Sequence, residues 1–279
     1  MQIFTTEKDL KLFLDSLRNN NIALVPTMGG LHEGHLSLVD KAKSLAQIVV
    51  VSIFVNPTQF ARGEDFDDYP NTFDSDKLLL ESKKVDALFL PSKDEIYPHG
   101  TESDYKVGDI GQILCGAFRP THFNGVAQVV RRFFEIVNPN YAVFGEKDFQ
   151  QLLIIKSLVK NLNFKIKIES IPTQREEDGL AMSTRNQYLS DLDREKAPHF
   201  YSVLSDTRDA LLDGKSIYDA REDALNTLSR SFEVEYLEVL DANNLTQIET
   251  KTSEIIIISA IRFGGTRLID NIVFRRTNV

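Results

Sequence analysis

The sequence contains very little cysteine: Cys115 is the single cysteine among 279 residues. One thiol cannot form an internal disulfide, and so low a cysteine content is typical of proteins from a reducing cytosol. The first eight residues also lack the basic and apolar regions of a secretory signal peptide. We therefore expect a cytoplasmic location.

Long hydrophobic runs and positive charge are also scarce. No apolar run reaches the length of a membrane-spanning helix, and the run at residues 255–258 has the length of a buried strand. The 32 Lys and Arg residues stand against 41 Asp and Glu, which gives a formal net charge of −9. These features predict no membrane and no nucleic-acid partner. They still allow an anionic small substrate, because phosphate sites are local.

What is present is the composition of a folded protein, with 42% hydrophobic and 26% charged residues. The length fits two domains or one large one. Up to about residue 174, apolar runs alternate with stretches of helical spacing, which is typical of βαβ units around a parallel sheet. We expect strands at residues 22–25, 48–55, 85–90, 141–144 and 164–171, and helices at residues 8–17, 36–45 and 125–137.

The pattern changes beyond residue 175. Helices are expected at residues 193–212 and 216–231, followed by strands at residues 232–240, 254–262 and 266–274. Helices followed by strands indicate an α+β unit. We therefore predict an α/β protein with a parallel-sheet domain at residues 1–174 and a smaller α+β domain at residues 175–279.

A glycine-rich segment at residues 26–36 lies between a predicted strand and a predicted helix, where open α/β sheets bind ligands. Glycines allow a close backbone approach, and a helix start offers N–H groups to an anion, so a phosphate site is the first hypothesis. The segment lacks the lysine and hydroxyl of a Walker A loop and the spacing of a dinucleotide fingerprint. The run from His32 to His35 is one residue too short for a zinc-protease motif.

The pattern that fits is His-x-Gly-His at His32 and His35. It resembles the motif of nucleotidyltransferases and class I aminoacyl-tRNA synthetases. In those enzymes histidines neutralise the charge that grows on the phosphates of ATP in the transition state. The alternative is a pair of histidines that only cap a helix or pack in a turn.

Polar side chains follow two further strands. Asn56 and Gln59 come after the strand at residues 48–55 and could hydrogen-bond a substrate with hydroxyl and carboxylate groups. Lys147 and Asp148 come after the strand at residues 141–144 and could hold a phosphate and a ribose hydroxyl, with a following glutamine for the second substrate. The alternatives are an Asn-Pro turn with a polar rim and an ordinary acidic helix start.

Two more segments could carry charge to the site. Residues 182–185 form the kind of short loop with Ser and Arg that grips triphosphate oxygens, or else a solvated linker. Residues 119–126 precede a predicted helix with Arg131 and Arg132, which could serve the cleft or lie on a solvated face. Cys115 has no evident activating base, so we interpret it as structural.

Taken together, these blocks resemble the pantothenate synthetase (pantoate–β-alanine ligase) family, within the nucleotidyltransferases with a HIGH motif. The match comprises Pro-Thr-Met-Gly-x-Leu-His-x-Gly-His, Phe-Val-Asn-Pro-x-Gln-Phe, Gly-Glu-Lys-Asp-x-Gln-Gln and Asp-Gly-Leu-Ala-Met-Ser-x-Arg-Asn, in family order between residues 26 and 189. Asn71, Thr121 and Thr184 stand where the family commonly has arginine, glycine and serine. The C-terminal part matches more loosely.

The resemblance implies an ATP-dependent ligase of coenzyme A biosynthesis that joins (R)-pantoate to β-alanine and forms pantothenate. The pantoate carboxylate attacks the α-phosphorus of ATP, giving pantoyl-adenylate and pyrophosphate. The amine of β-alanine then displaces AMP. Mg²⁺ is expected to enter with ATP, and no protein ligand can be assigned to it. The implied fold is a Rossmann-like domain with a smaller lid domain, usually in a homodimer.

Residue by residue, the resemblance implies that His35 is the proton donor and that His32 stabilises phosphate charge. Lys147, Ser183 and Arg185 would be further catalytic groups. Pantoate would be held by Gln59 and Gln151, with Asn56 nearby and Gln59 also close to β-alanine. Gln174 would touch adenine through its backbone, and Asp148 would lie near the ribose. The implied ATP-binding residues are Met28, Gly29, Gly30, Leu31, His32, Glu33, Gly34, His35, Gly145, Glu146, Lys147, Asp148, Gln174, Met182, Ser183, Thr184 and Arg185.

Two other functions stay open at this point. A nucleotidyltransferase that adds AMP or CMP to a phosphorylated small molecule would share the histidine loop, although the amides of Gln59 and Gln151 suit a hydroxy-acid better than a second phosphate. A non-enzymatic ATP-binding module would tolerate the loss of the charged and histidine side chains of these motifs. All of them are present: His32, His35, Lys147 and Arg185. Release of AMP only with both pantoate and β-alanine would distinguish the ligase.

Overall fold

The structure is a computed structural model that describes residues 1–17, 19–61, 63–102 and 105–276. The chain divides into two compact units. The first, which we call the sheet unit, comprises Met1–Glu146 and Gln151–Pro172. The second, the C-terminal unit, comprises Lys147–Gln150 and Thr173–Val279.

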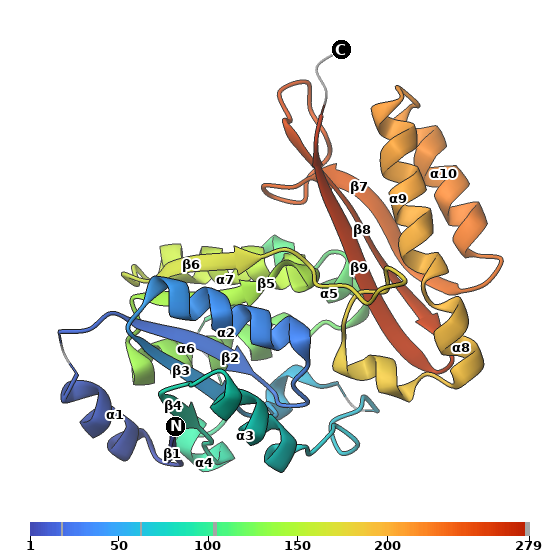
Figure 1. Ribbon diagram of the computed structural model, residues 1–279. Helices are drawn as coiled ribbons and strands as arrows, with labels where there is room; N and C mark the ends of the chain where they lie inside the picture. Colours follow the sequence, from blue (N-terminus) through green and yellow to red (C-terminus); the bar gives the residue numbers. More distant parts are fainter. Residues whose placement is uncertain (18, 62, 103–104, 277–279) are drawn as a thin grey trace. The chain divides into compact units, whose positions relative to one another are not determined.

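A six-stranded parallel sheet forms the middle of the sheet unit (Figure 1). Its order is β1-β4-β3-β2-β5-β6, so the direction in which the chain adds strands reverses between β2 and β5. In open α/β sheets, ligands bind beyond the carboxyl ends of the strands at such a reversal. The strands are β1 (Gln2–Phe4), β2 (Ile22–Thr27), β3 (Ile48–Ile53), β4 (Ala87–Phe89), β5 (Tyr141–Gly145) and β6 (Lys167–Ile171).

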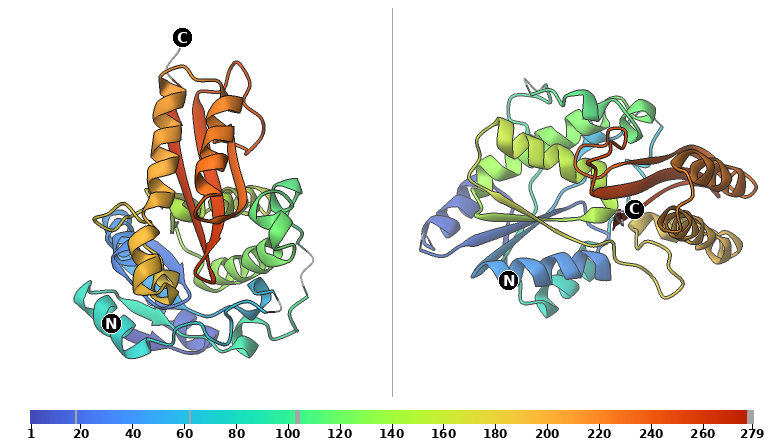
Figure 2. Two further views of the ribbon diagram at one scale, coloured as in Figure 1. Left: turned by 90° about the vertical axis from the view of Figure 1, so that its right-hand side faces the viewer. Right: turned by 90° about the horizontal axis from the view of Figure 1, so that it is seen from above.

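Helices cover both faces of this sheet, as the right-hand view of Figure 2 shows. Successive strand residues point to opposite faces, so Leu24 joins the core with α6 and Val25 joins the core with α2. A strand buried on both faces needs a nearly continuous apolar run, which explains the sequence of β3, where Ser52 is the one polar residue. The helices are α1 (Glu7–Asp15), α2 (Glu33–Leu45), α3 (Phe73–Ser82), α4 (Lys93–Ile96), α5 (Cys115–Phe118), α6 (His122–Val137) and α7 (Phe149–Asn161), with 3₁₀ turns η1 (Pro57–Gln59), η2 (Asp109–Gly111) and η3 (Glu146–Asp148).

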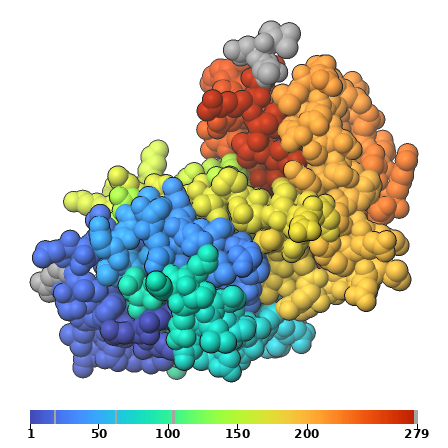
Figure 3. Space-filling view, in the orientation of Figure 1, coloured from blue at the N-terminus to red at the C-terminus, as the bar shows by residue number. Residues whose placement is uncertain are grey.

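Helices α2 and α3 lie side by side on the surface of the sheet unit (Figure 3). Lys83 Nζ lies 2.6 Å from Asp40 Oδ2, and Lys43 Nζ donates to the carbonyl of Lys84 at 2.9 Å. Beneath them, Val39 and Leu80 share one apolar core. This packing brings the start of α3 next to the loop that follows β2.

The C-terminal unit is an antiparallel sheet of order β7-β8-β9 covered by helices (Figure 1). Its core includes Phe200 and Leu204 from α9 and Ile257 from β8. The elements are η4 (Thr184–Tyr188), α8 (Asp191–Lys196), α9 (His199–Leu212), α10 (Ile217–Leu228), β7 (Glu233–Asp241), β8 (Glu254–Phe263) and β9 (Thr266–Arg275). The predicted fold class, an α/β parallel-sheet domain with a smaller α+β domain, is confirmed.

The structure differs from the predicted elements in particular places. The single helix expected at residues 193–212 is two helices, because Pro198 lacks the N–H that a continuous helix would use there and instead occupies the N-cap of α9. Strand β1 and helix α3 were not predicted. Within the part of the chain that the structure describes, no helix is long and apolar enough to cross a membrane.

Candidate active site

The loop after β2 is held by side chains of its own unit. Gly29 and Gly30 adopt φ of +86° and +63°, a conformation that only glycine reaches without strain. The N–H of Gly29 donates to Thr27 Oγ1 at 3.3 Å. The N–H groups of Gly30 and Leu31 donate to the carboxylate of Asp76 at 3.0 and 2.8 Å. A protein carboxylate therefore already accepts these two loop N–H groups.

The two histidines stand at the start of α2 and bond to each other's backbone. His32 is the N-cap, and its Nδ1 accepts from the N–H of Gly34 at 3.1 Å. His35 Nδ1 accepts from the N–H of His32 at 3.3 Å, which completes a reciprocal capping box. The ring centroids lie 4.1 Å apart. Since each Nδ1 is an acceptor, each neutral ring carries its proton on Nε2 and can donate from there.

Asn56 is almost fully buried, with 1% of its surface exposed, and its amide bonds to protein on both sides. Its Nδ2 donates to Gln59 Oε1 and to the carbonyl of Gly125, both at 3.1 Å. Its Oδ1 accepts from Tyr97 Oη at 2.7 Å and from Thr58 Oγ1 at 2.9 Å. Burial raises the pKa of the Tyr97 hydroxyl to about 12, so it stays protonated as a donor. Asn56 therefore fixes the orientation of Gln59.

Gln59 joins this network to the glycine loop. Its Nε2 lies 3.1 Å from Met28 Sδ, and its carbonyl lies 2.8 Å from His122 Nδ1. Arg119 Nη2 also donates to that carbonyl at 3.3 Å while it pairs with Glu64 at 2.6 Å. Burial by itself raises the pKa of the Glu64 carboxyl, but the hydrogen bonds and charge of Arg119 outweigh burial and hold that pKa below its usual value. The segment 119–122 thus supports the backbone of Gln59.

Three further predicted residues lie in the sheet unit near the end of β5, and a fourth lies at the start of α2. Gly145 is the last residue of β5, and Glu146 opens η3 and accepts a 2.7 Å hydrogen bond from Ser170 Oγ. Gln151 is half-buried in the first turn of α7. Glu33 is exposed in the first turn of α2, where its carboxylate suits the helix dipole.

Lys147 and Asp148 belong to the C-terminal unit. Lys147 Nζ lies 3.9 Å from Asp148 Oδ2, and its side chain is 21% exposed. The carbonyl of Lys147 accepts from Asn271 Nδ2 at 3.0 Å, which connects the lysine to β9. Asp270, the neighbour of Asn271, is almost fully buried and takes both ends of the Arg175 guanidinium at 2.6 and 2.9 Å. Burial raises the pKa of the Asp270 carboxyl, and the charge of Arg175 opposes that rise.

The segment 174–185 forms a tight hairpin followed by a 3₁₀ turn. The N–H of Met182 donates to the carbonyl of Gln174 at 2.9 Å, and Arg175 forms a β-bridge with Ala181. Ser183 is the N-cap of η4, where its Oγ accepts from the N–H of Arg185 at 3.3 Å. Met182, Ser183, Thr184 and Arg185 are therefore held on one short turn, and Thr184 is its first residue.

The predicted site residues thus fall into two groups, one in each unit. The sheet unit connects Met28, Asn56 and Gln59 directly and pairs His32 with His35. The C-terminal unit holds Lys147, Asp148, Gln174 and residues 182–185. Within the described residues, no group of three or more His, Cys, Asp or Glu side chains is arranged to hold a metal ion.

Sequence reasoning missed the buried aspartates Asp76 and Asp270. Both lie on the buried face of a helix or strand. Asp76 lies one helical turn before buried Leu80, and Asp270 lies between buried Leu268 and Ile272 on one face of β9. A carboxylate at a core position requires donors. This signal is readable in the sequence for Asp270, because a strand is predicted at residues 266–274, but not for Asp76, because helix α3 is not predicted.

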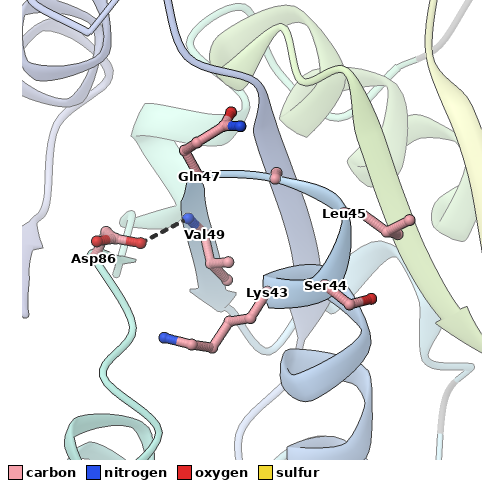
Figure 4. Close-up of a pocket in the computed structure, with 7 residues that line it drawn as sticks. Lys43, Ser44, Leu45, Gln47, Val49 and Asp86 are labelled. Atoms are coloured by element: carbon pink, nitrogen blue, oxygen red, sulfur yellow. Dashed lines mark hydrogen bonds between the residues drawn. The ribbon is translucent and has the colours of Figure 1, made fainter.

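A surface pocket lies away from this site (Figure 4). Lys43, Gln47, Val49 and Asp86 line it, and the N–H of Val49 donates to Asp86 Oδ2 at 2.9 Å. These residues lie at the amino end of β3, whereas parallel sheets bind ligands at the carboxyl ends of their strands. The pocket therefore has no place in the candidate active site.

Comparison with known proteins gives one family. The family model described as pantoate–β-alanine ligase matches residues 2–273. The pantothenate synthetase of Ruthia magnifica subsp. Calyptogena magnifica is 52% identical over 259 residues, covering 93% of each chain. That of Laribacter hongkongensis is 47% identical over 280 residues, covering 99% of this chain and 100% of the relative.

Solved structures agree with this result. The pantothenate synthetase from Thermus thermophilus has a TM-score of 0.92 at 41% identity and covers 98% of this chain and 99% of that one. The pantoate–β-alanine ligase from Francisella tularensis, complexed with beta-gamma ATP and β-alanine, has a TM-score of 0.83 at 38% identity. It covers 98% of this chain and 97% of that one.

Proposed function

The chain belongs to the pantoate–β-alanine ligase family, and from this premise we propose which of its residues carry out the reaction. The enzyme condenses (R)-pantoate with β-alanine to pantothenate through pantoyl-adenylate, and it releases pyrophosphate and AMP. A carboxylate is a poor electrophile until its oxygen becomes part of a good leaving group. The first step therefore requires positioning and charge stabilisation rather than a covalent bond to the protein.

The observation that carries the proposal is the hydrogen bonding of the two histidine rings, from which their tautomer is assigned. Because both Nδ1 atoms accept backbone N–H bonds, both rings present Nε2–H donors. Negative charge grows on the phosphate oxygens as the pantoate carboxylate attacks the α-phosphorus. Ring donors fixed in advance stabilise that charge more than they stabilise bound ATP. We assign His35 as the proton donor and His32 as the stabiliser of phosphate charge.

The C-terminal unit supplies the remaining groups that bind ATP. In the proposal, Lys147, Ser183 and Arg185 contact the phosphates, and Asp148 contacts the ribose. Gln174 contacts adenine through its backbone. The compact turn at residues 182–185 supports this assignment, because its N-cap bond fixes the backbone from which Ser183 and Arg185 project. The planar guanidinium of Arg185 suits bidentate binding of phosphate oxygens.

Gln59 and Gln151 are proposed to hold pantoate, and Gln59 also lies near β-alanine. Asn56 contributes mainly by fixing Gln59, since its own amide is buried and bonded to protein. An amide held in one orientation distinguishes hydroxyl from carboxylate oxygens at little entropic cost. The network from Tyr97 through Asn56 to Gln59 supports this role.

Four further assignments belong to the proposal. Mg²⁺ would enter bound to ATP, with phosphate oxygens and water as its ligands, as is usual for this ion. The functional domains would be residues 1–174 and 175–279, with the second as a lid. The enzyme would be a homodimer, and it would act in the cytoplasm. Light scattering of the purified protein tests the dimer, and limited proteolysis tests the boundary near residue 174.

The deciding experiment measures AMP formation from ATP and Mg²⁺, with pantoate and β-alanine supplied singly and together. AMP that requires both acids supports the ligase. If the protein is folded and binds ATP but forms no AMP with both substrates, the proposed function is wrong. AMP or CMP transfer to a phosphorylated acceptor would instead favour the nucleotidyltransferase alternative.

A further inference from the structure

The carboxylate of Asp76 is the anchor of the loop that precedes the histidines. Asp76 stands in the first turn of α3 and is 1% exposed. Its Oδ2 accepts from the N–H of Gly30 at 3.0 Å and from Thr72 Oγ1 at 3.0 Å, and its Oδ1 accepts from the N–H of Leu31 at 2.8 Å. Thr72 Oγ1 also accepts from the N–H of Gly30 at 3.1 Å.

This arrangement is a backbone concavity filled by a protein anion. Where Gly29 and Gly30 adopt positive φ, the consecutive N–H groups of Gly30 and Leu31 converge on one carboxylate, as the N–H groups of an anion-binding nest converge on an anion. A Cβ on Gly29 would lie 3.1 Å from Asp76 Oδ2, so loop and carboxylate fit each other closely. In a phosphate-binding loop such N–H groups would bind the substrate. Here the carboxylate of Asp76 accepts them.

The consequence concerns the histidines. His32 follows Leu31 directly and is the N-cap on which the capping box with His35 depends. The direction in which the loop enters α2 therefore sets where the two rings lie relative to β2. Asp76 fixes that direction from a different helix, α3, which itself packs beside α2 through Lys83 and Asp40.

We propose that Asp76, with Thr72, is a positioning residue for the His32–His35 pair: it closes the backbone nest so that the imidazole N–H groups, and not the loop backbone, receive the phosphate charge of ATP. This inference rests on the function proposed above. It assigns to Asp76 no contact with substrate. A misplacement of catalytic groups by about 1 Å costs on the order of 10²-fold in rate, so the effect on turnover is large.

The test is Asp76→Asn, which keeps the shape but replaces one accepting oxygen with an NH₂ group. We expect kcat to fall by about 10- to 100-fold while the KM values for ATP and β-alanine change by less than about threefold, because the histidines act mainly in the transition state. Pantoate-dependent exchange of pyrophosphate into ATP should fall by the same factor, since it reports the first step alone.

A measurement on the folded protein distinguishes a positioning role of Asp76 from a role only in stability. The ring ¹⁵N and ¹H signals of His32 and His35 should shift in Asp76→Asn. A role only in stability would lower the melting temperature and leave those signals in place. Asp74→Asn is the matched control: it removes the same charge from the first turn of the same helix at an exposed position, and it should keep wild-type kinetics.

If Asp76→Asn does not fold, Thr72→Val tests the positioning role instead. It keeps the carboxylate but removes the hydroxyl that bridges Gly30 and Asp76, and we expect kcat to fall by about 3- to 10-fold with unchanged KM. A wild-type kcat in folded Asp76→Asn would overturn the inference. If only Thr72→Val folds, a wild-type kcat in that variant would do the same. An equal loss of kcat in the control Asp74→Asn would also overturn it. If the wild-type enzyme forms no AMP, the function fails; if it does and Asp76→Asn is equally active, only the positioning role fails.

Discussion

In each of the two histidines, one ring nitrogen has a structural role and the other is left for the proposed chemistry. Nδ1 of each ring caps the start of α2, and Nε2 is left to carry the proton that the proposed mechanism uses. The sequence motif predicts that these two histidines act on phosphate, and that role stays a prediction. The motif could not identify the tautomer, because that depends on which backbone N–H the folded loop turns toward each ring.

We expect His35→Ala to reduce kcat/KM by about 10²- to 10³-fold, the usual cost of removing one preorganised donor. It also removes one half of the capping box, at a cost of about 1 kcal/mol in unfolding free energy. Steady-state kinetics with a parallel urea titration measure both effects. His199→Ala, an exposed histidine at the start of α9, is the control and should keep full activity. Near-normal turnover of His35→Ala would contradict the mechanism.

A pH-dependent contribution to stability comes from the Glu64–Arg119 pair. Arg119 holds the folded-state pKa of Glu64 below the ordinary value of 4.5. A lowered folded pKa means that the pair stabilises the protein fully above pH 4.5 and loses this contribution as the pH falls through the folded pKa. Glu64→Gln should therefore lower the unfolding free energy by about 1 to 2 kcal/mol at about pH 7. The difference in unfolding free energy between variant and wild type should decrease below pH 4.5. An equal difference at neutral pH and well below pH 4.5 would refute this account.

Elements with a strong periodic pattern were predictable, and elements set by distant contacts were not. The apolar run of β3 and the buried face of α6 gave their positions within a few residues. Strand β1 is three residues long and exists because it pairs with β4, which lies far along the chain. The buried face of helix α3 includes the polar residue Asp76, which weakens the apolar stripe of the helix. The sequence pattern therefore does not indicate a helix here, although the segment packs as one in the fold.

The hairpin at residues 174–182 turns at Gly179, which has φ of +92°. A Cβ there would lie 2.7 Å from Tyr201 Cδ1, the ring that also stacks on Arg175. Gly214 has nearly the same φ, +91°, and no atom within 4 Å of its Cβ position. Gly214→Ala should cost about 1 kcal/mol from backbone strain, and Gly179→Ala about 1 to 3 kcal/mol more from the clash. Thermal unfolding of both variants measures the difference, and equal costs would show that Tyr201 yields freely.

At the scale of the molecule, the two units enclose separate cores. Leu24 lies in the core between the parallel sheet and α6, and Leu204 lies in the core of the C-terminal unit; both have no exposed surface. The family identity could be read from the ordered motifs. The grouping of Lys147–Gln150 with the C-terminal unit could not, because it comes from contacts with residues far along the chain, such as that of Asn271 with the carbonyl of Lys147.

Separate cores predict that unfolding occurs in two calorimetric steps. Leu24→Ala and Leu204→Ala should each cost about 2 to 5 kcal/mol in their own unit. Each variant should lower the temperature of one step and leave the other unchanged. A single transition that both variants shift equally would show that the protein unfolds as one cooperative unit.

The strand order has a consequence for synthesis of the chain. Strand β2, which leads into the histidine loop, lies between β3 and β5, and Ala23 pairs with both Val49 and Tyr141. While the ribosome makes the chain, β2 can find β3 early but must wait for the whole segment through α6 before its second edge is covered. During that interval an apolar, unpaired edge is exposed, which is the usual starting point of aggregation. The most vulnerable nascent chains are therefore those that end between β3 and β5.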